Sequence, residues 1–201
     1  MAATSPPRIF PGIAFQLPDE GMNDQQFYRF CLLNPELRIE RTPDKFIVII
    51  PPTNADTGKK NFSFSGELYV WNRLHRLGEG FDSSTGFKLP NGAERSPGAA
   101  WIRKDRREAL PAAERQKFAP VCPDFVAEIR SPDQSMAALK EKMNEYMLNG
   151  ALLGWLIDPQ KSHHLGIHPR HRTNPCSFDA VILGGSLMPG FEVCLTDIWG
   201  I

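Results

Sequence analysis

Two apolar segments separated by one amphipathic helix constrain this chain more than any other feature. Residues 125–129 (FVAEI) and 152–157 (LLGWLI) have the length and composition of buried strands, and a proline follows shortly after each. The intervening residues 134–149 place four apolar side chains on one helical stripe: Leu139, Met143, Tyr146 and Met147. This order predicts a right-handed crossover that sets two parallel strands side by side. We therefore expect an α/β or α+β domain, with helices flanking a mixed central sheet.

Length and composition indicate one globular unit. The chain has 201 residues, 41% of them hydrophobic, and its 23 Lys and Arg balance its 23 Asp and Glu. We find no internal repeat and no linker, so we expect a single domain over 1–201, with 1–22 as an extended, peripheral lead. Because the formal charge is zero, any contact with nucleic acid must rest on local basic patches.

The sequence also bears on location. No apolar run approaches the roughly 18 residues that a membrane-spanning helix needs, and the first ten residues do not resemble a signal peptide. The four cysteines are scattered and form no Cys-x-x-Cys pair, which favours reduced thiols. We therefore expect a cytoplasmic protein with no membrane partner.

The rest of the chain alternates short helices and strands. We expect an extra N-terminal helix over 24–34, a helix over 59–77 that ends at Gly78, and two short helices between residues 103 and 117. Strands are expected over 37–40 paired with 45–50, over 85–89 paired with 99–102 as a hairpin, and near the end of the chain over 163–168, 178–183 and 191–195.

Glu128 is the most informative single residue, because it interrupts an otherwise apolar strand. An unpaired buried carboxylate costs several kcal/mol, so it requires a partner. Strand alternation puts Glu128 and Arg130 on one face, and at ~100° per residue Lys142 lies about 40° beyond Tyr146, at the rim of the helical stripe. A carboxylate beside two basic side chains could bind a hard cation through its oxygens and a phosphate through its cations. A structural ion pair of Glu128 with Arg130 or Lys142 explains the residues as well.

Three segments also carry a family resemblance: FDSSTGFKLPNGAERSPGAAW from Phe81, CPDFVAEIRS from Cys122 and KEKMNEYMLNGALLGWLIDP from Lys140. Together they resemble the Uma-type restriction endonuclease family, within the PD-(D/E)xK nuclease superfamily, over about residues 24–199. The resemblance implies a restriction-endonuclease-like fold and a metal-dependent endodeoxyribonuclease that hydrolyses DNA with Mg²⁺ or Mn²⁺. It also implies a homodimer, because related nucleases often cut both strands as dimers.

The resemblance assigns roles to individual residues. Glu128 maps onto the metal-binding catalytic acid, and the backbone carbonyl of Ile129 onto a further metal ligand. Arg130 takes the basic position two residues after the acid, and Lys142 on the helix replaces the strand lysine, so that both would stabilise charge on the phosphate while the metal activates water. Glu67 matches an acid that binds a second cation or orients water, although a plain surface acid fits its position equally well.

One position departs from the family pattern. Where the family has Ser-Pro-Asp, this chain has Gly98, which provides no carboxylate for the metal. Asp82 and Glu94 flank the same hairpin and are candidate replacements, whereas Asp124 lies about 13 Å from Glu128 along one strand. The resemblance therefore implies either an impaired endonuclease or a DNA-binding or interaction protein on a nuclease scaffold.

A basic cluster follows the strand that ends near residue 102. It comprises Arg103, Lys104, Arg106 and Arg107. These side chains are candidates for binding DNA phosphates, which would fix position on DNA without reading sequence. A solvated helix start explains the cluster equally well.

Overall fold

The central sheet is built around β8 (Phe125–Ile129), all of whose residues are buried. The structure, a computed structural model, describes residues 10, 12–17, 21–161, 163–168, 171–172 and 176–200. On one side β8 pairs in parallel with β9 (Leu153–Asp158), and on the other it pairs antiparallel with β7 (Ala99–Arg103). The parallel pair on either side of one helix confirms the predicted strand, helix, strand unit.

The remaining strands extend this sheet at both edges. β4 (Gly78–Asp82) lies beyond β7, and β10 (His163–His168) lies beyond β9. β11 (His171–Arg172) and β12 (Cys176–Ser177) both pair with β10. The strand order β11-β10-β9-β8-β7-β4 contains one parallel pair and otherwise antiparallel neighbours, so the predicted mixed sheet is confirmed.

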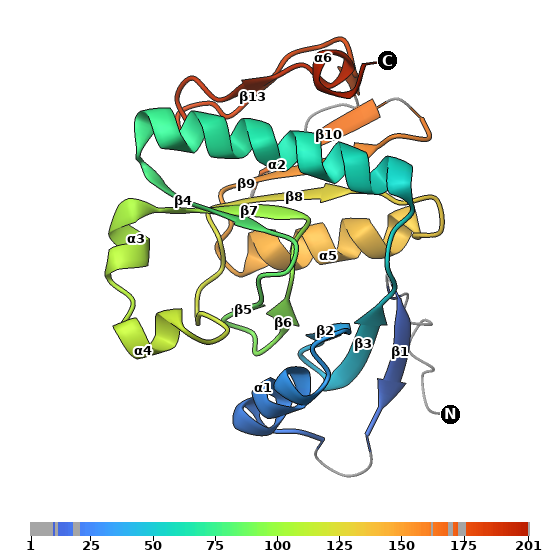
Figure 1. Ribbon diagram of the computed structural model, residues 1–201, viewed down its shortest axis with the longest axis vertical. Coiled ribbons are helices and arrows are strands. Elements are labelled where there is room, and N and C mark those ends of the chain that lie inside the picture. Colours follow the sequence, from blue (N-terminus) through green and yellow to red (C-terminus); the bar gives the residue numbers. More distant parts are fainter. Residues whose placement is uncertain are drawn as a thin grey trace.

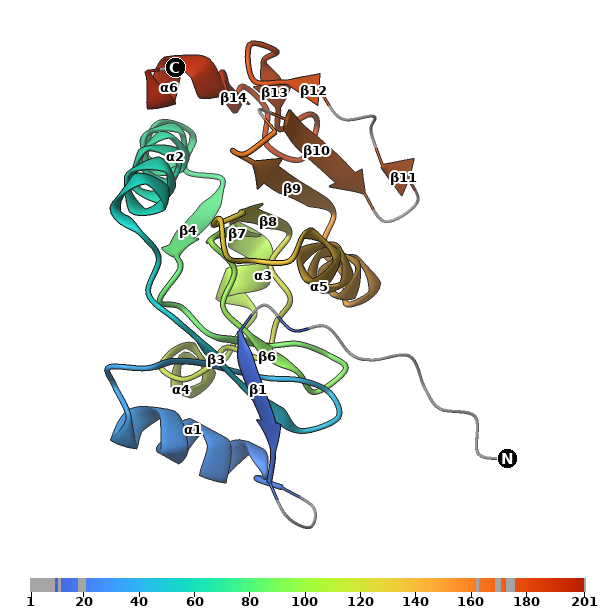
Figure 2. The same cartoon turned by 90° about the vertical axis from the view of Figure 1, so that its right-hand side faces the viewer.

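Two long helices cover opposite faces of the sheet, as Figure 1 shows: α2 (Ala55–His75) and α5 (Met136–Leu148). Alternate residues of β8 divide between them, because Phe125, Ala127 and Ile129 enter the core beside α2 while Val126 enters the core beside α5. The C-terminal segment with β13 (Ile182–Leu183), β14 (Glu192–Val193) and α6 (Leu195–Trp199) adds to the α2 side (Figure 2).

A second, smaller sheet lies at the other end of the molecule (Figure 1). Its antiparallel order is β1-β3-β2-β6-β5, and its strands are β1 (Ile13–Gln16), β2 (Arg38–Arg41), β3 (Phe46–Ile50), β5 (Phe87–Lys88) and β6 (Glu94–Arg95). The predicted N-terminal helix is α1 (Asp24–Leu33), which begins at a capping box formed by Asn23 and Gln26. Phe27 of α1 packs against Ile39 and Ile47, so this helix closes a core of its own.

The predicted hairpin between 85–89 and 99–102 is wrong. β5 pairs with β6 in the smaller sheet, whereas β7 pairs with β4 and β8 in the central sheet. Residues 85–102 therefore pass from one sheet to the other. β4 was missed because its first and third residues are glycines, which are rare in strands. A side chain at Gly78 would meet the Ile102 carbonyl at 2.1 Å, so the close approach to β7 requires glycine there.

Other boundaries also differ. Helix α2 begins four residues earlier than predicted, after the cap Asn54, and its C-terminal cap is Arg76 in the left-handed region rather than Gly78. The two short helices are present as α3 (Lys104–Glu108) and α4 (Ala112–Arg115). Helix α6 was not predicted. Part of the predicted lead forms β1, and residues 1–9, 11 and 18–20 lie outside the described residues.

Candidate active site

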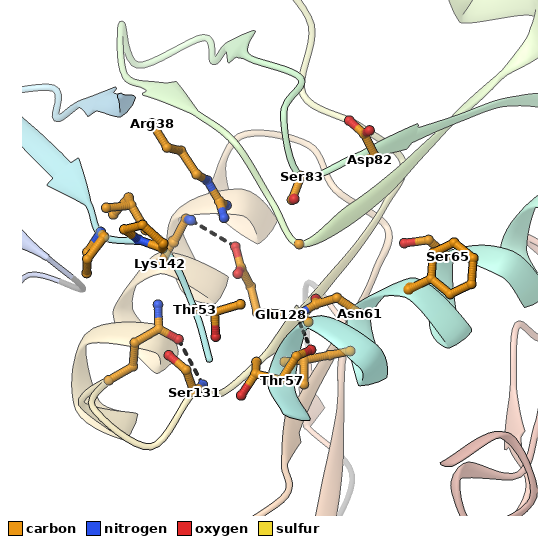
Figure 3. A pocket seen from close by; sticks show the side chains of 18 of the residues that line it. Arg38, Thr53, Thr57, Asn61, Ser65, Asp82, Ser83, Glu128, Ser131 and Lys142 are labelled. Atoms are coloured by element: carbon orange, nitrogen blue, oxygen red, sulfur yellow. Dashed lines mark hydrogen bonds and ion pairs between the residues drawn. The ribbon is translucent and has the colours of Figure 1, made fainter. Parts of the chain in front are cut away.

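A cleft of about 540 Å³ lies between the smaller sheet and the first turns of α2. One wall comes from β2 and the segment after β3, and includes Arg38 and Thr53. The opposite wall comes from Thr57, Asn61 and Ser65, which follow one another at intervals of four residues and therefore lie on one face of α2. Gly98, Glu128 and Lys142 also line the cleft, which Figure 3 shows from close by.

Glu128 and Lys142 meet in this cleft. The Lys142 ammonium lies 2.9 Å from Oε1 of Glu128, and both side chains are more than nine-tenths buried. The Tyr146 hydroxyl donates a longer hydrogen bond of 3.4 Å to the same oxygen. Burial, together with the charge of Glu128, raises the pKa of Tyr146 well above its usual 10, so this phenol is a neutral donor. Strand β8 and helix α5 thus bring Glu128 and Lys142 into contact.

Glu40 is a third member of the site, and the sequence analysis missed it. This fully buried residue of β2 accepts hydrogen bonds from Lys142 Nζ at 2.7 Å, the Ser96 amide at 3.0 Å and Arg95 Nη1 at 3.2 Å. Burial raises the pKa of the Glu40 carboxyl, but the charges of Lys142, Arg95 and Arg38 outweigh that effect and bring it to about 2. The only local signal was a charged residue in a short strand.

These residues belong to a larger group of charges, which we call the ion cluster. It comprises the carboxylates of Glu40, Glu128 and Glu145 and the cations Lys142, Arg95 and Arg38. Arg95 joins Glu40 to Glu145, whose Oε2 lies 2.5 Å from Arg95 Nε. Arg38 donates to the Ser96 carbonyl through Nη2, and its buried Nε has no hydrogen-bond partner among the described residues. The ion cluster thus contains as many cations as carboxylates.

Gly98 is buried beside Glu128, immediately before β7. A Cβ atom built there would lie 2.9 Å from the Ala127 carbonyl oxygen and 3.5 Å from Asn61 Oδ1. Any side chain at this position therefore requires a small shift of the backbone. The glycine brings no side-chain carboxylate to the cleft.

The residues present do not fit a preformed site for a divalent metal ion. Among the described residues, no three His, Cys, Asp or Glu side chains come together in a way that could hold one. The Oε1 atom of Glu128 already contacts an ammonium, and Gly98 adds no side-chain oxygen. Ile129 lines the cleft, but a single backbone carbonyl does not make a site without further carboxylates.

The two candidate replacement acids have different surroundings. Asp82 lies at the end of β4, opposite Ala99 of β7, and lines the same cleft as Glu128. It is exposed and accepts hydrogen bonds from the amide and hydroxyl of Ser84. Glu94 is buried outside the cleft, where its two oxygens each lie 2.6 Å from the Arg41 guanidinium. Only Asp82 of this pair faces the cleft.

Two other predicted site residues lie elsewhere. Arg130 pairs with Asp158 at 3.1 Å and donates to the Gln134 carbonyl, and it is not among the residues that line the cleft. Glu67 is exposed on α2 and is also absent from the lining. Because the cleft-facing positions of that helix are 57, 61 and 65, a residue two places beyond Ser65 points to a different side.

The predicted DNA-binding cluster lies at the far end of β7 from Gly98. Each of its four members contacts an acid: Arg103 with Asp105, Lys104 with Glu108, Arg106 with Asp124, and Arg107 with Glu79. Asp124 is buried and also accepts from the Arg103 amide, which makes it part of the support for the end of β7. The structure thus separates this cluster from the cleft and pairs its charges.

The arrangement resembles a crystal structure described as "a putative nuclease belonging to DUF820 from Anabaena variabilis", with a TM-score of 0.70 and 20% sequence identity over 82% of this chain and 91% of that one. The two proteins share a mixed α/β fold. No curated protein matched the chain.

The family assignment rests on the sequence. The family model Uma2, described as "Putative restriction endonuclease", matches residues 24–196. The chain therefore belongs to the Uma2 family, as its motifs predicted. Family and fold together support a nuclease-like function. None of the helices in the described part of the chain is long and apolar enough to cross a membrane.

Proposed function

We propose that this protein is a cytoplasmic DNA-binding member of its nuclease family, with metal-dependent endonuclease activity impaired by Gly98. One observation carries the proposal: the acid of the cleft, Glu128, already contacts the ammonium of Lys142. In addition, glycine occupies position 98, to which the family resemblance assigns a metal-binding aspartate. The scaffold and the cleft are retained while the donor set for Mg²⁺ or Mn²⁺ is incomplete.

The cleft keeps groups that suit a phosphodiester. Arg38 and Lys142 bring two cations to it, and a guanidinium binds phosphate oxygens through its planar array of N–H donors. Hydroxyl and amide side chains on α2 add neutral donors. The basic cluster from Arg103 to Arg107 is a second candidate contact for DNA. Because its charges are paired, we expect it to contribute less than Arg38.

An active endonuclease is the second candidate, and Asp82 is the observation that favours it. This exposed carboxylate lines the same cleft as Glu128, so a rearranged loop after β4 would supply the missing acid. In that case cleavage with Mg²⁺ or Mn²⁺ depends on both acids, and Asp82→Asn abolishes it. A homodimer, which would present two clefts to the two strands of DNA, belongs to this candidate and is measurable by sedimentation.

The two candidates separate in one set of assays. Fluorescence anisotropy with a labelled duplex measures binding, and conversion of supercoiled plasmid measures cleavage, each with Mg²⁺, Mn²⁺ or EDTA. Under our proposal the wild type binds DNA and nicks it no faster than Asp82→Asn does. Absence of DNA binding by a folded wild type would refute the proposal. Metal-dependent nicking that Asp82→Asn removes would favour the second candidate.

A further inference from the structure

The ammonium of Lys142 lies among oxygen atoms of the kind that bind hard metal ions. Its three neighbours are Glu40 Oε1 at 2.7 Å, Glu128 Oε1 at 2.9 Å and the carbonyl oxygen of Ser96 at 3.4 Å. Two carboxylates and a backbone carbonyl are ligands that Mg²⁺, Ca²⁺ and Mn²⁺ share. Figure 3 shows the ammonium end of Lys142 directed at the Glu128 carboxylate.

The charges around Lys142 are balanced without any further cation. The three carboxylates of the ion cluster face three cations, two of which, Lys142 and Arg95, contact Glu40 directly. An aspartate at position 98 would add a fourth carboxylate and leave a net negative charge that a divalent ion could neutralise. The absence of a carboxylate at position 98 therefore agrees with a lysine ammonium, rather than a divalent ion, at the centre of these carboxylates.

We propose that Lys142 is the resident cation of this centre, and that Glu40 is the positioning residue that holds its ammonium on Glu128. The inference rests on the proposed function only in treating the cleft as a nuclease centre. A divalent ion must compete with a tethered ammonium for Glu128, and removing that ammonium opens a site made of Glu40, Glu128 and the Ser96 carbonyl. Metal–oxygen bonds of about 2.0–2.6 Å are shorter than the ammonium contacts, so the carboxylates must close in.

The test is a titration of the purified full-length protein with Mn²⁺ alone, followed by calorimetry. We expect no saturable binding by the wild type and one site in Lys142→Met, with affinity at least tenfold tighter than any wild-type binding. Lys140→Met is the matched control, because Lys140 is an exposed lysine on the same helix. It should titrate like the wild type.

A second variant tests the part of Glu40. In the double variant Lys142→Met/Glu40→Gln the acquired Mn²⁺ site should be lost, and a purely structural role for Glu40 would leave it intact. The proposal is overturned if folded Lys142→Met gains no Mn²⁺ binding, or if the wild type binds Mn²⁺ saturably and Glu128→Gln abolishes that binding. Saturable Mn²⁺ binding by the wild type overturns the proposal in this way even where Lys142→Met does not fold. DNA binding is measured separately, so each proposal can fail alone.

Discussion

At the scale of single residues, the proposed loss of activity depends on Gly98, which brings no carboxylate to the cleft. Gly98→Asp restores a carboxylate beside Glu128, and the contact of its Cβ with the Ala127 carbonyl predicts a stability loss of about 1–3 kcal/mol. We expect Mg²⁺- or Mn²⁺-dependent nicking of plasmid DNA that the further change Glu128→Gln removes. Gly98→Asn is the matched control, since it has the same size without the charge and should lose stability without gaining cleavage. A cleaving Gly98→Asn would contradict the role of the carboxylate.

Glu40 makes a second prediction at this scale, on pH. Its pKa lies at about 2 in the folded protein, below its ordinary value of 4.5. A carboxyl whose pKa is lowered by folding contributes stability above the unfolded value, and that contribution, roughly 3 kcal/mol, is lost as pH falls from about 4.5 towards 2. The free energy of unfolding from urea titrations should therefore fall less steeply over this range in Glu40→Gln. Equal slopes would show that Glu40 is not held ionised.

At the scale of secondary structure, the end of α2 offers a clean test. Arg76 caps the helix with a φ of 53°, in the left-handed region that costs a non-glycine residue about 1–2 kcal/mol. Arg76→Gly relieves this backbone cost, but the greater freedom of glycine in the unfolded chain offsets part of the gain. We therefore expect Arg76→Gly to stabilise the protein by up to about 1 kcal/mol. Arg73→Gly, an exposed change inside the same helix, should destabilise it by about 1 kcal/mol. Thermal unfolding of both variants measures the contrast, and an unstable Arg76→Gly would contradict it.

The elements that the sequence predicted well are those with strong local patterns. Helix α5 and strands β8 and β9 have clear periodicity and terminal signals, and they bring Glu128 and Lys142 together as that periodicity suggested. The partner of β7 was predicted wrongly because strand pairing depends on the whole sheet. Glu40 was missed for the same reason, since it meets Lys142 from 102 residues away in the chain.

At the scale of the whole molecule, the neutral net charge means that DNA affinity must come from particular cations. We expect Arg38→Gln to weaken duplex binding and to reduce the slope of log affinity against log salt concentration by about 0.9, the loss of one phosphate contact. Lys104→Gln, in the paired basic cluster, should change the slope less. Anisotropy titrations at several salt concentrations measure the slope for each variant. A larger reduction of the slope by Lys104→Gln than by Arg38→Gln would place the DNA at the far end of β7.

The central claim is that this nuclease cleft, with Glu128 held by Lys142 and with glycine at position 98, does not perform metal-dependent cleavage efficiently. The most direct measurement compares the rate of plasmid nicking by the wild type and by Glu128→Gln in excess Mg²⁺ and again in excess Mn²⁺. We predict equal rates for the two proteins with either ion. A wild-type rate that exceeds that of folded Glu128→Gln by tenfold or more would contradict the claim and establish an active endonuclease.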